Sequence, residues 1–278
     1  MAGASTPATR TARRSPFLHS LRTLRVIAGV DFQLKYSGSV LGYVWSVLKP
    51  LALFTMLYFI FGRVFRLGEI SQYYPLSLLL GIVFFTFFAD ATSLGMYSIL
   101  SRESLVRKLS FPRLIIPTSA TLTAAMTFAV NCLVIVVFIA WNGITPRLTW
   151  LLLVPLLIQL YVLVLGVALI LATVFVRLRD IGQVWELLLQ LMFYGSPIIY
   201  PIGFLPPWAR DLGFLSPFTQ ILQDARSLVL YADLPANRIT ADDAFRTGRL
   251  APIGITIGIL LLGLWLFRRE EPWFAERV

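Results

Sequence analysis

The chain has 278 residues, of which 58% are hydrophobic and 14% are charged. A soluble protein of this length could not cover so much apolar surface, so the composition excludes that class and indicates an integral membrane protein. The formal net charge of +10 does not indicate a nucleic-acid partner, because the cations are distributed by membrane side and do not form one patch.

The N-terminal segment divides into a tail and a helix. Residues 1–16 are basic and rich in Ala, Ser, Thr and Pro, without the apolar core of a signal peptide, and are predicted to form a disordered cytoplasmic tail. Residues 17–36 are predicted to form an amphipathic helix that lies in the cytoplasmic membrane interface. Its apolar face holds Phe17, Leu21, Leu24, Ala28 and Phe32. An ordinary cytoplasmic helix packed on the membrane domain is the alternative.

Residues 37–278 are predicted to form one all-α membrane domain with six transmembrane helices. Six apolar runs are long enough to cross about 30 Å of hydrocarbon, which takes roughly 20 helical residues. These runs are residues 40–62, 75–100, 114–141, 148–176, 181–200 and 250–267. The short loops on one side carry more Arg and Lys than those on the other, so the positive-inside rule predicts that both termini are cytoplasmic.

The segment between the last two runs, residues 201–231, is apolar enough to enter a membrane but is divided by prolines. Neither piece can span alone, which predicts two short helices that enter and leave the outer leaflet with their loose backbone buried in protein. An amphipathic loop on the outer surface is the alternative. The candidate residues of this segment and its approach are Pro197, Tyr200, Pro201, Phe204, Pro206, Pro207, Trp208, Pro217 and Phe218.

The loop between the second and third runs has an unusual sequence, SRESLVRKLSFPRLIIP, at residues 101–117. Leu105 and Leu109, at i and i+4, predict a short amphipathic helix over residues 101–110, and Pro112 would end it. A loop whose cations only set the topology is the alternative. The candidate residues of this helix and its corner are Arg102, Glu103, Leu105, Arg107, Lys108, Leu109, Phe111, Pro112 and Arg113.

Motifs for catalysis are missing from the sequence. No G-x-x-x-x-G-K-[ST] motif occurs, so the chain is not expected to bind ATP in the P-loop manner. His19 is the single histidine and Cys132 the single cysteine, which are too few for a Cys/His zinc site. His19 lies beside the predicted tail and Cys132 in an apolar run, so no catalytic Cys–His dyad is expected. We therefore expect no enzymatic activity, no cofactor and no metal on this chain.

Three charged residues fall inside the predicted spans, where ionisable groups usually mark function. Asp90 is either a proton relay or one end of a polar contact that orients helices, and the second reading is favoured because no further acid or histidine accompanies it. Glu186 lies near a cytoplasmic end and can reach water there. Lys49 precedes Pro50 and must reach the membrane surface or face a wet interior.

Three blocks of sequence together resemble the ABC-2 type permeases that export polysaccharides, the Wzm-type O-antigen permeases with their capsule and teichoic-acid relatives. The first block, DFQLKYSGSVLGYVWSVLKPLALFTMLYFIFGRVFR, begins at Asp31. The second, ESLVRKLSFPRLIIP, is similar to the first cytoplasmic loop of that family. The third, RDIGQVWELLLQLMFYGSPIIYPIGFLP, is similar to its fifth span and gate entrance. The resemblance covers residues 31–230.

The resemblance implies a mechanism that composition cannot supply. Such permeases form homodimers and bind two separate ATP-binding subunits, which hold ATP and Mg, on the cytoplasmic face of the inner membrane. ATP hydrolysis there moves a lipid-linked glycan through a channel between the protomers. In that family the first cytoplasmic loop is a coupling helix that inserts into the ATPase, and two short helices between spans five and six form an outer gate. The strong preference for Arg over Lys, typical of G+C-rich genomes, favours a cell-wall galactan over an O-antigen or teichoic acid as cargo.

A channel at the seam between protomers would use the first and fifth spans. Candidate lining residues are two pairs of adjacent aromatics, Tyr58 with Phe59 and Phe193 with Tyr194. Neighbours on a helix lie about 100° apart, so only one member of each pair can point into the channel. Two other functions stay open on the sequence alone: an ABC-2 exporter of drugs or small lipids, and a membrane-embedded glycosyl- or phosphotransferase.

Overall fold

The computed structural model describes residues 24–33, 42–70, 73–103, 112–231, 239–244 and 248–274. Within these ranges the chain is helical and contains no strand, which confirms the all-α prediction for the described part. Residues 24–33 form a helix inside the predicted interface helix. The predicted tail, the rest of that helix and residues 104–111 lie outside the described ranges.

Five of the described helices are long and apolar enough to cross a membrane. The first is α2 (Gly42–Leu57) with its π-helical continuation η1 (Tyr58–Val64). The second and third are α4 (Tyr74–Tyr97) and α6 (Ile115–Trp141). The fourth is η3 (Leu148–Leu152) with α7 (Leu153–Arg177), and the fifth is α12 (Leu250–Glu270), which η6 (Glu271–Trp273) follows.

The predicted span at residues 181–200 is shorter in the structure. Helix α8 (Ile181–Gly195) has 15 residues and so a length of about 22 Å, less than the roughly 30 Å of a bilayer core. The helix stops before Pro197, because a residue that precedes proline is pushed out of the helical conformation. Residues 196–199 then form a buried turn. The prediction of six full transmembrane helices is therefore not confirmed: the described part has five, and a short α8.

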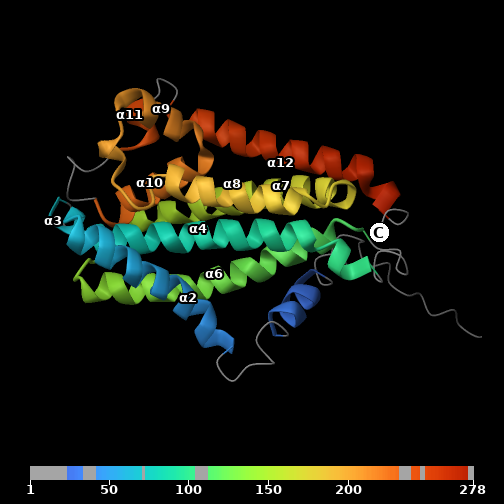
Figure 1. Ribbon diagram of the computed structural model, residues 1–278, viewed down its shortest axis with the longest axis horizontal. Coiled ribbons are helices and arrows are strands. Elements are labelled where there is room, and N and C mark those ends of the chain that lie inside the picture. Colours follow the sequence, from blue (N-terminus) through green and yellow to red (C-terminus); the bar gives the residue numbers. More distant parts are fainter. Residues whose placement is uncertain are drawn as a thin grey trace, which may run out of the picture.

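Helix α4 lies at the centre of the bundle (Figure 1) and is the most buried of the long helices. It packs against α2, α6, α7 and α8. Phe128 of α6 contacts Phe84 edge-on and Phe87 face-on, with ring centroids 5.4 and 4.6 Å apart. Such ring pairs add to the apolar burial that holds the two helices together.

Small residues bring α7 and α12 together. A Cβ on Gly166 would lie 2.8 Å from the Leu260 backbone, and one on Gly263 would lie 2.6 Å from the carbonyl oxygen of Gly166. Backbones approach this closely only where no side chain intervenes, which is the usual basis of tight helix packing in membranes.

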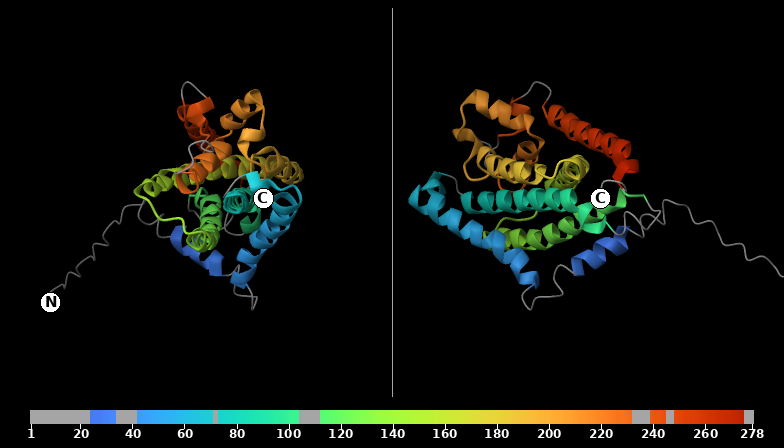
Figure 2. Two further views of the ribbon diagram at one scale, coloured as in Figure 1. Left: turned by 90° about the vertical axis from the view of Figure 1, so that its left-hand side faces the viewer. Right: turned by 45° about the vertical axis from the view of Figure 1, so that its right-hand side comes forward.

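The long helices lie side by side, so the connecting segments gather at two ends (Figures 1 and 2). We call one the loop end; it holds the helix of residues 24–33, residues 98–103 and 112–114, the α7–α8 turn and η6. The other, the gate end, holds η1, α3 (Leu67–Ile70), the α6–η3 turn, α9 (Pro207–Leu215) and α11 (Ala241–Ala244). Which end is cytoplasmic stays a prediction.

The proline-divided segment forms the predicted pair of short helices. After η4 (Ile202–Phe204), α9 begins at Pro207 and α10 (Pro217–Val229) begins at Pro217. Proline suits the first helical position, where its missing N–H has no partner to lose. Nearly all of α10 is buried against α4, α7 and α12, whereas α9 is mostly exposed. Whether the pair dips into the bilayer stays a prediction.

Candidate functional site: a polar face and a buried gate cluster

One side of the otherwise buried α4 is accessible and partly polar. Thr86, Asp90, Ser93 and Tyr97 recur three or four residues apart and are half-buried or exposed, while the neighbouring positions are mostly enclosed. This spacing places the four on one helical stripe. The central helix therefore presents hydroxyl and carboxyl groups along one line at membrane depth.

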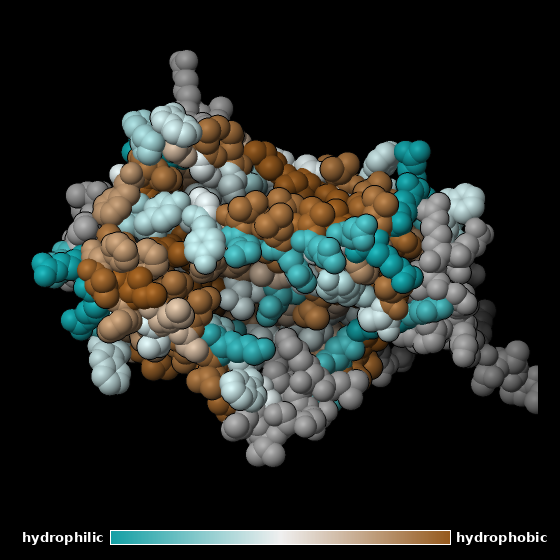
Figure 3. Space-filling model, in the orientation of Figure 1, coloured by the Kyte–Doolittle hydropathy of each residue, from teal (hydrophilic) through white to brown (hydrophobic). Residues whose placement is uncertain are grey.

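The two helices beside this stripe add more polar groups. Gln183, Glu186 and Gln190 of α8 are exposed at i, i+3 and i+7, and Lys49 of α2 is also exposed. Both α2 and α8 pack on α4, and Figure 2 shows them beside it. On the face shown in Figure 3, a band of hydrophilic residues runs through a hydrophobic surface.

We call this surface the polar face and define it by Lys49, Asp90, Gln183, Glu186 and Gln190. Charged and amide groups are costly against lipid and normally face a protein partner or water. The polar face carries charges of both signs and neutral amides, a mixture that suits hydroxyl-rich ligands better than a single ion. It includes the three intramembrane charges that the sequence singled out.

The four candidate lining aromatics divide into one exposed and one packed residue per pair. Phe59 is 65% exposed and Tyr194 is 58% exposed. Tyr58 stacks on Phe54 at 5.8 Å, and Phe193 meets Phe85 edge-on at 5.1 Å. Phe59 and Tyr194 are therefore available to another molecule, while their neighbours contact the chain's own core. Their role in lining a channel stays a prediction.

An aromatic cluster holds α8, which carries part of the polar face, against α4. The Trp185 indole donates a hydrogen bond of 3.2 Å to the Thr92 hydroxyl, and its ring lies 6.1 Å from that of Phe88. Phe88 also contacts Phe218, the gate candidate at the start of α10, at 5.5 Å. One group of rings thus joins α4, α8 and α10.

The gate end contains a buried arginine that sequence reasoning missed. Arg226 of α10 is 2% exposed, and its guanidinium donates to three backbone carbonyls. The acceptors are Ser77, at 2.8 and 3.2 Å, Pro197, at 2.6 Å, and Ile198, at 2.9 Å. In the turn after α8 the carbonyls of Pro197 and Ile198 have no helical partner, and Arg226 supplies the N–H donors that they need. Burial lowers the pKa of Arg226 to about 10, which keeps it charged at neutral pH.

Two neighbours complete this Arg226 cluster. The Tyr74 hydroxyl donates to the Ile199 carbonyl at 2.8 Å, so the turn is held from α4 as well. A Cβ on Gly81 would lie 2.8 Å from the Arg226 guanidinium and 3.0 Å from the Ile198 side chain. Only glycine leaves room for the arginine there. The available signal in the sequence was a cation inside an apolar segment, in a helix that begins at Pro217.

A second polar cluster ties α10 to its other neighbours. Asp224, 2% exposed, accepts hydrogen bonds from Gln220 at 2.6 Å and from Arg249 at 2.8 Å. Gln159 of α7 donates to Gln220 at 2.7 Å, and Arg249 also lies 3.3 Å from Asp242. Burial raises the pKa of Asp224, and the bonds from Gln220 and Arg249 oppose that rise.

Of the other gate candidates, Pro197 and Pro217 are buried, Tyr200 and Pro201 are half-buried, and the rest are exposed: Phe204, Pro206, Pro207 and Trp208. The Tyr200 hydroxyl donates to the Gly195 carbonyl at 3.2 Å, across the turn that ends α8. The predicted gate segment thus has a buried part, around α10, and an exposed part, around α9.

At the loop end, one arginine of the predicted coupling helix and one that follows it bind within the chain. Arg102 pairs with Asp31 of the N-terminal helix and donates to the Ser119 hydroxyl at 2.9 Å. The Arg113 backbone N–H donates to the Glu271 carboxylate at 3.1 Å, and its guanidinium donates to the Glu271 carbonyl.

These contacts change the expected use of the loop cations. Arg102 is a candidate residue of a helix that inserts into a partner, but the structure pairs it with Asp31 of the same chain. Glu103 and Pro112 are exposed. The remaining candidates, Leu105, Arg107, Lys108, Leu109 and Phe111, lie outside the described residues.

Long apolar helices, an accessible polar face at membrane depth and buried polar clusters at one end define a multi-pass membrane protein of the transporter class. The chain belongs to the ABC-2 type transporter family, whose model matches residues 22–230.

Named relatives extend over almost the whole chain. An O-antigen export system permease protein RfbA of Klebsiella pneumoniae is 30% identical over 91% of this chain and 93% of its own length. The RfbA protein of Myxococcus xanthus is 28% identical over 89% of this chain and 92% of its length. The polysialic acid transport protein KpsM of Escherichia coli is 22% identical over 93% of this chain and 97% of its length.

Proposed function

We propose that this chain is the permease subunit of an ATP-driven exporter that moves a lipid-linked polysaccharide across the inner membrane to its outer side. The observation that carries the proposal is the polar face, where charged and amide side chains are accessible at membrane depth. The names of the relatives support the cargo class, since they concern O-antigen and polysialic acid. A cell-wall galactan or an O-antigen is the expected cargo.

In this proposal two copies of the chain form a homodimer with their polar faces toward each other. Glutamine amides and carboxylates can hydrogen-bond sugar hydroxyls, and aromatic rings can stack on the apolar faces of sugar rings. Phe59 and Tyr194 have the exposure needed for such stacking. Helix α8 and the buried turn after it would complete the sixth crossing, shielded from lipid by the second protomer.

Energy would come from two separate ATP-binding subunits on the cytoplasmic side, where both termini also lie. They would press on the loop of residues 101–113. Its two flanks are tied to other elements through Arg102–Asp31 and Arg113–Glu271, so a displacement of the loop would reach the N-terminal helix and the end of α12 together.

The gate end would close the outer mouth of the path. Helix α10 is enclosed by protein and linked to the turn after α8 by Arg226. Since α8 carries three members of the polar face, a movement of α8 would act on the gate through this link.

The direct test is depletion of the protein in its native host, followed by analysis of lipid-linked glycans on each side of the membrane. We expect polyprenyl-linked glycan to accumulate on the cytoplasmic side. Loss of polymer synthesis without precursor accumulation would favour the transferase function. A change in drug sensitivity alone would favour a small-molecule exporter.

A further inference from the structure

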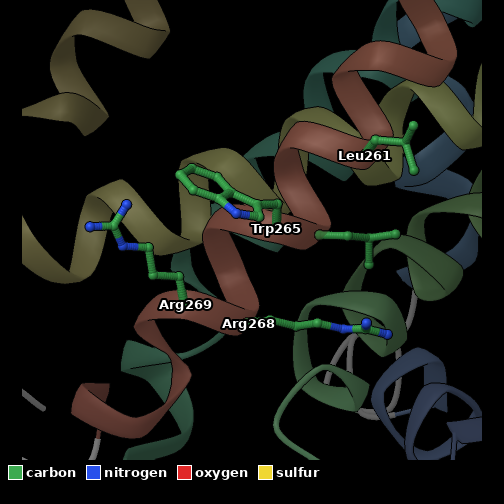
Figure 4. A pocket seen from close by; sticks show the side chains of 5 residues that line it. Leu261, Trp265, Arg268 and Arg269 are labelled. Carbon is green, nitrogen blue, oxygen red and sulfur yellow. The ribbon is translucent and has the colours of Figure 1, made fainter.

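The loop end of α12 carries an exposed basic and aromatic surface that the proposed export path does not use. Leu261, Leu264, Trp265, Arg268 and Arg269 line a shallow hollow of about 470 Å³. All five lie on α12, at i, i+3, i+4, i+7 and i+8, which makes them one side of a helix. In Figure 4 Arg269 extends on the same side of α12 as Trp265, and Arg268 extends on the side of Leu261.

The neighbouring acids do not neutralise these arginines. The sequence runs Arg268-Arg269-Glu270-Glu271, but Glu270 pairs with Arg177 of α7 and Glu271 binds Arg113. Neither Arg268 nor Arg269 has an ion pair with an acid in the described part of the chain. Two acids therefore turn into the protein, and two cations stay at its surface.

The aromatic residue sits where a membrane interface would place it. Trp265 is 56% exposed, and the Arg269 guanidinium lies 5.3 Å from its ring centroid, within cation–π distance. Tryptophan prefers the headgroup level of the bilayer, and arginine beside it can bind phosphate oxygens through several N–H groups. The exposed leucines Leu261 and Leu262 continue the surface toward the membrane interior.

This surface is also separate from the polar face. Helix α12 packs on α7 at one edge of the bundle, and α2 lies at the opposite edge (Figure 1). A second protomer placed on the polar face would thus leave the end of α12 open to lipid.

We propose that Trp265, Arg268 and Arg269 form a binding site for an anionic phospholipid of the membrane leaflet at the loop end. The two guanidinium groups bind the headgroup phosphate from either side, and the acyl chains lie along Leu261 and Leu264. The bound lipid anchors the helix end that Glu270 and Glu271 connect to α7 and to the flank of the loop. A zwitterionic lipid carries an ammonium group that the arginines repel, so it binds more weakly.

The experiment measures lipid binding to the purified full chain in detergent by native mass spectrometry. The probes are phosphatidylglycerol and phosphatidylcholine with the same acyl chains. Wild-type protein should bind phosphatidylglycerol at least tenfold more tightly. The double variant Arg268→Gln/Arg269→Gln should bind it about 25-fold more weakly than wild type, at about fivefold for each arginine near a membrane surface. Free inorganic phosphate at millimolar concentration should not compete, which distinguishes a lipid site from a phosphate site.

Two further variants control for net charge and geometry. Arg63→Gln/Arg66→Gln removes two exposed arginines at the gate end, one of them 6.0 Å from the Tyr58 ring, and should bind phosphatidylglycerol as wild type does. Arg268→Lys/Arg269→Lys keeps the charge and should stay within about fivefold of wild type. Equal binding of the two lipids by wild-type protein would overturn the proposal without any variant. Wild-type affinity in a folded Arg268→Gln/Arg269→Gln variant, or competition by phosphate, would overturn it too.

Discussion

The two ends of the molecule hold most of their charged groups at different depths, although Glu270 is a buried charge at the loop end. At the loop end, ion pairs such as Arg102–Asp31 lie at a partly exposed surface, with side chains 18% and 26% exposed. At the gate end, Arg226 and Asp224 are almost fully buried and bind carbonyls and amides inside the protein. Surface ion pairs contribute about 0–1 kcal/mol, whereas breaking a buried charged cluster costs about 3–5 kcal/mol. The Arg102–Asp31 pair can therefore rearrange at a lower cost than the Arg226 cluster at the gate end.

This contrast suits a transporter driven from one side. An element that follows a motor must exchange contacts in every cycle, which weak surface pairs allow. A gate must hold the membrane closed between cycles, which strong buried contacts favour. The Arg226 cluster joins the gate to α8, so the same contacts that hold the gate also give it a connection to the polar face.

The strongest test of the contrast is Arg226→Met. Methionine fills similar apolar space but leaves the carbonyls of Ser77, Pro197 and Ile198 without this donor. We expect a loss of about 3–5 kcal/mol in the free energy of unfolding. Thermal unfolding of the purified protein in detergent measures it. Arg226→Lys keeps the charge but has fewer donors, so its stability should lie between those of wild type and Arg226→Met. A wild-type melting temperature for Arg226→Met would contradict the stabilising role of Arg226.

A smaller effect is expected from Gly81→Ala. The new Cβ would lie 2.8 Å from the Arg226 guanidinium and 3.0 Å from Ile198, so the cluster must shift. Overpacking of this kind costs about 1–3 kcal/mol. The matched control is Gly258→Ala on α12, where the new Cβ would have no atom within 4 Å apart from its own stretch of helix. The control should leave the stability unchanged or raise it slightly. Equal melting temperatures for the two variants would mean that the space around Gly81 is not filled.

The smallest effect on stability is expected at the loop end, from Asp31→Asn. It removes the ion pair with Arg102, so the free energy of unfolding should fall by about 1 kcal/mol or less. Asp180→Asn, at an exposed position of the same end, is the control and should change nothing measurable. A loss from Asp31→Asn as large as that from Arg226→Met would remove the difference between the two ends.

Local patterns in the sequence predicted elements well and long-range contacts poorly. Apolar length predicted six spans, five of which are long helices in the structure, and the prolines predicted the starts of α9 and α10, because both effects act within a few residues. The length of α8 was overestimated because residues 196–200 are apolar but not helical. The Arg102–Asp31 and Arg226–Ser77 contacts join residues 71 and 149 positions apart, and no periodicity encodes such pairs.

The charged residues at membrane depth were recognised individually from the sequence, but not as one surface. Lys49, Asp90 and Glu186 belong to three separate helices, and the packing of α2 and α8 on α4 brings these helices together. Similarly, adjacent aromatics were expected to divide into inward and outward members, and the structure shows which member of each pair is packed on the core.

The central claim is that the polar face borders water, whereas the equally exposed side of α12 borders lipid. It is tested most directly by cysteine labelling on a Cys132→Ala background, with a small membrane-impermeant thiol reagent applied to the assembled transporter. Gln190→Cys on α8 and Leu262→Cys on α12 are both exposed in the single chain. The account predicts that Gln190→Cys labels at least tenfold faster than Leu262→Cys. Equal, slow labelling of both positions would contradict it and would place the polar face against lipid or a dry interface.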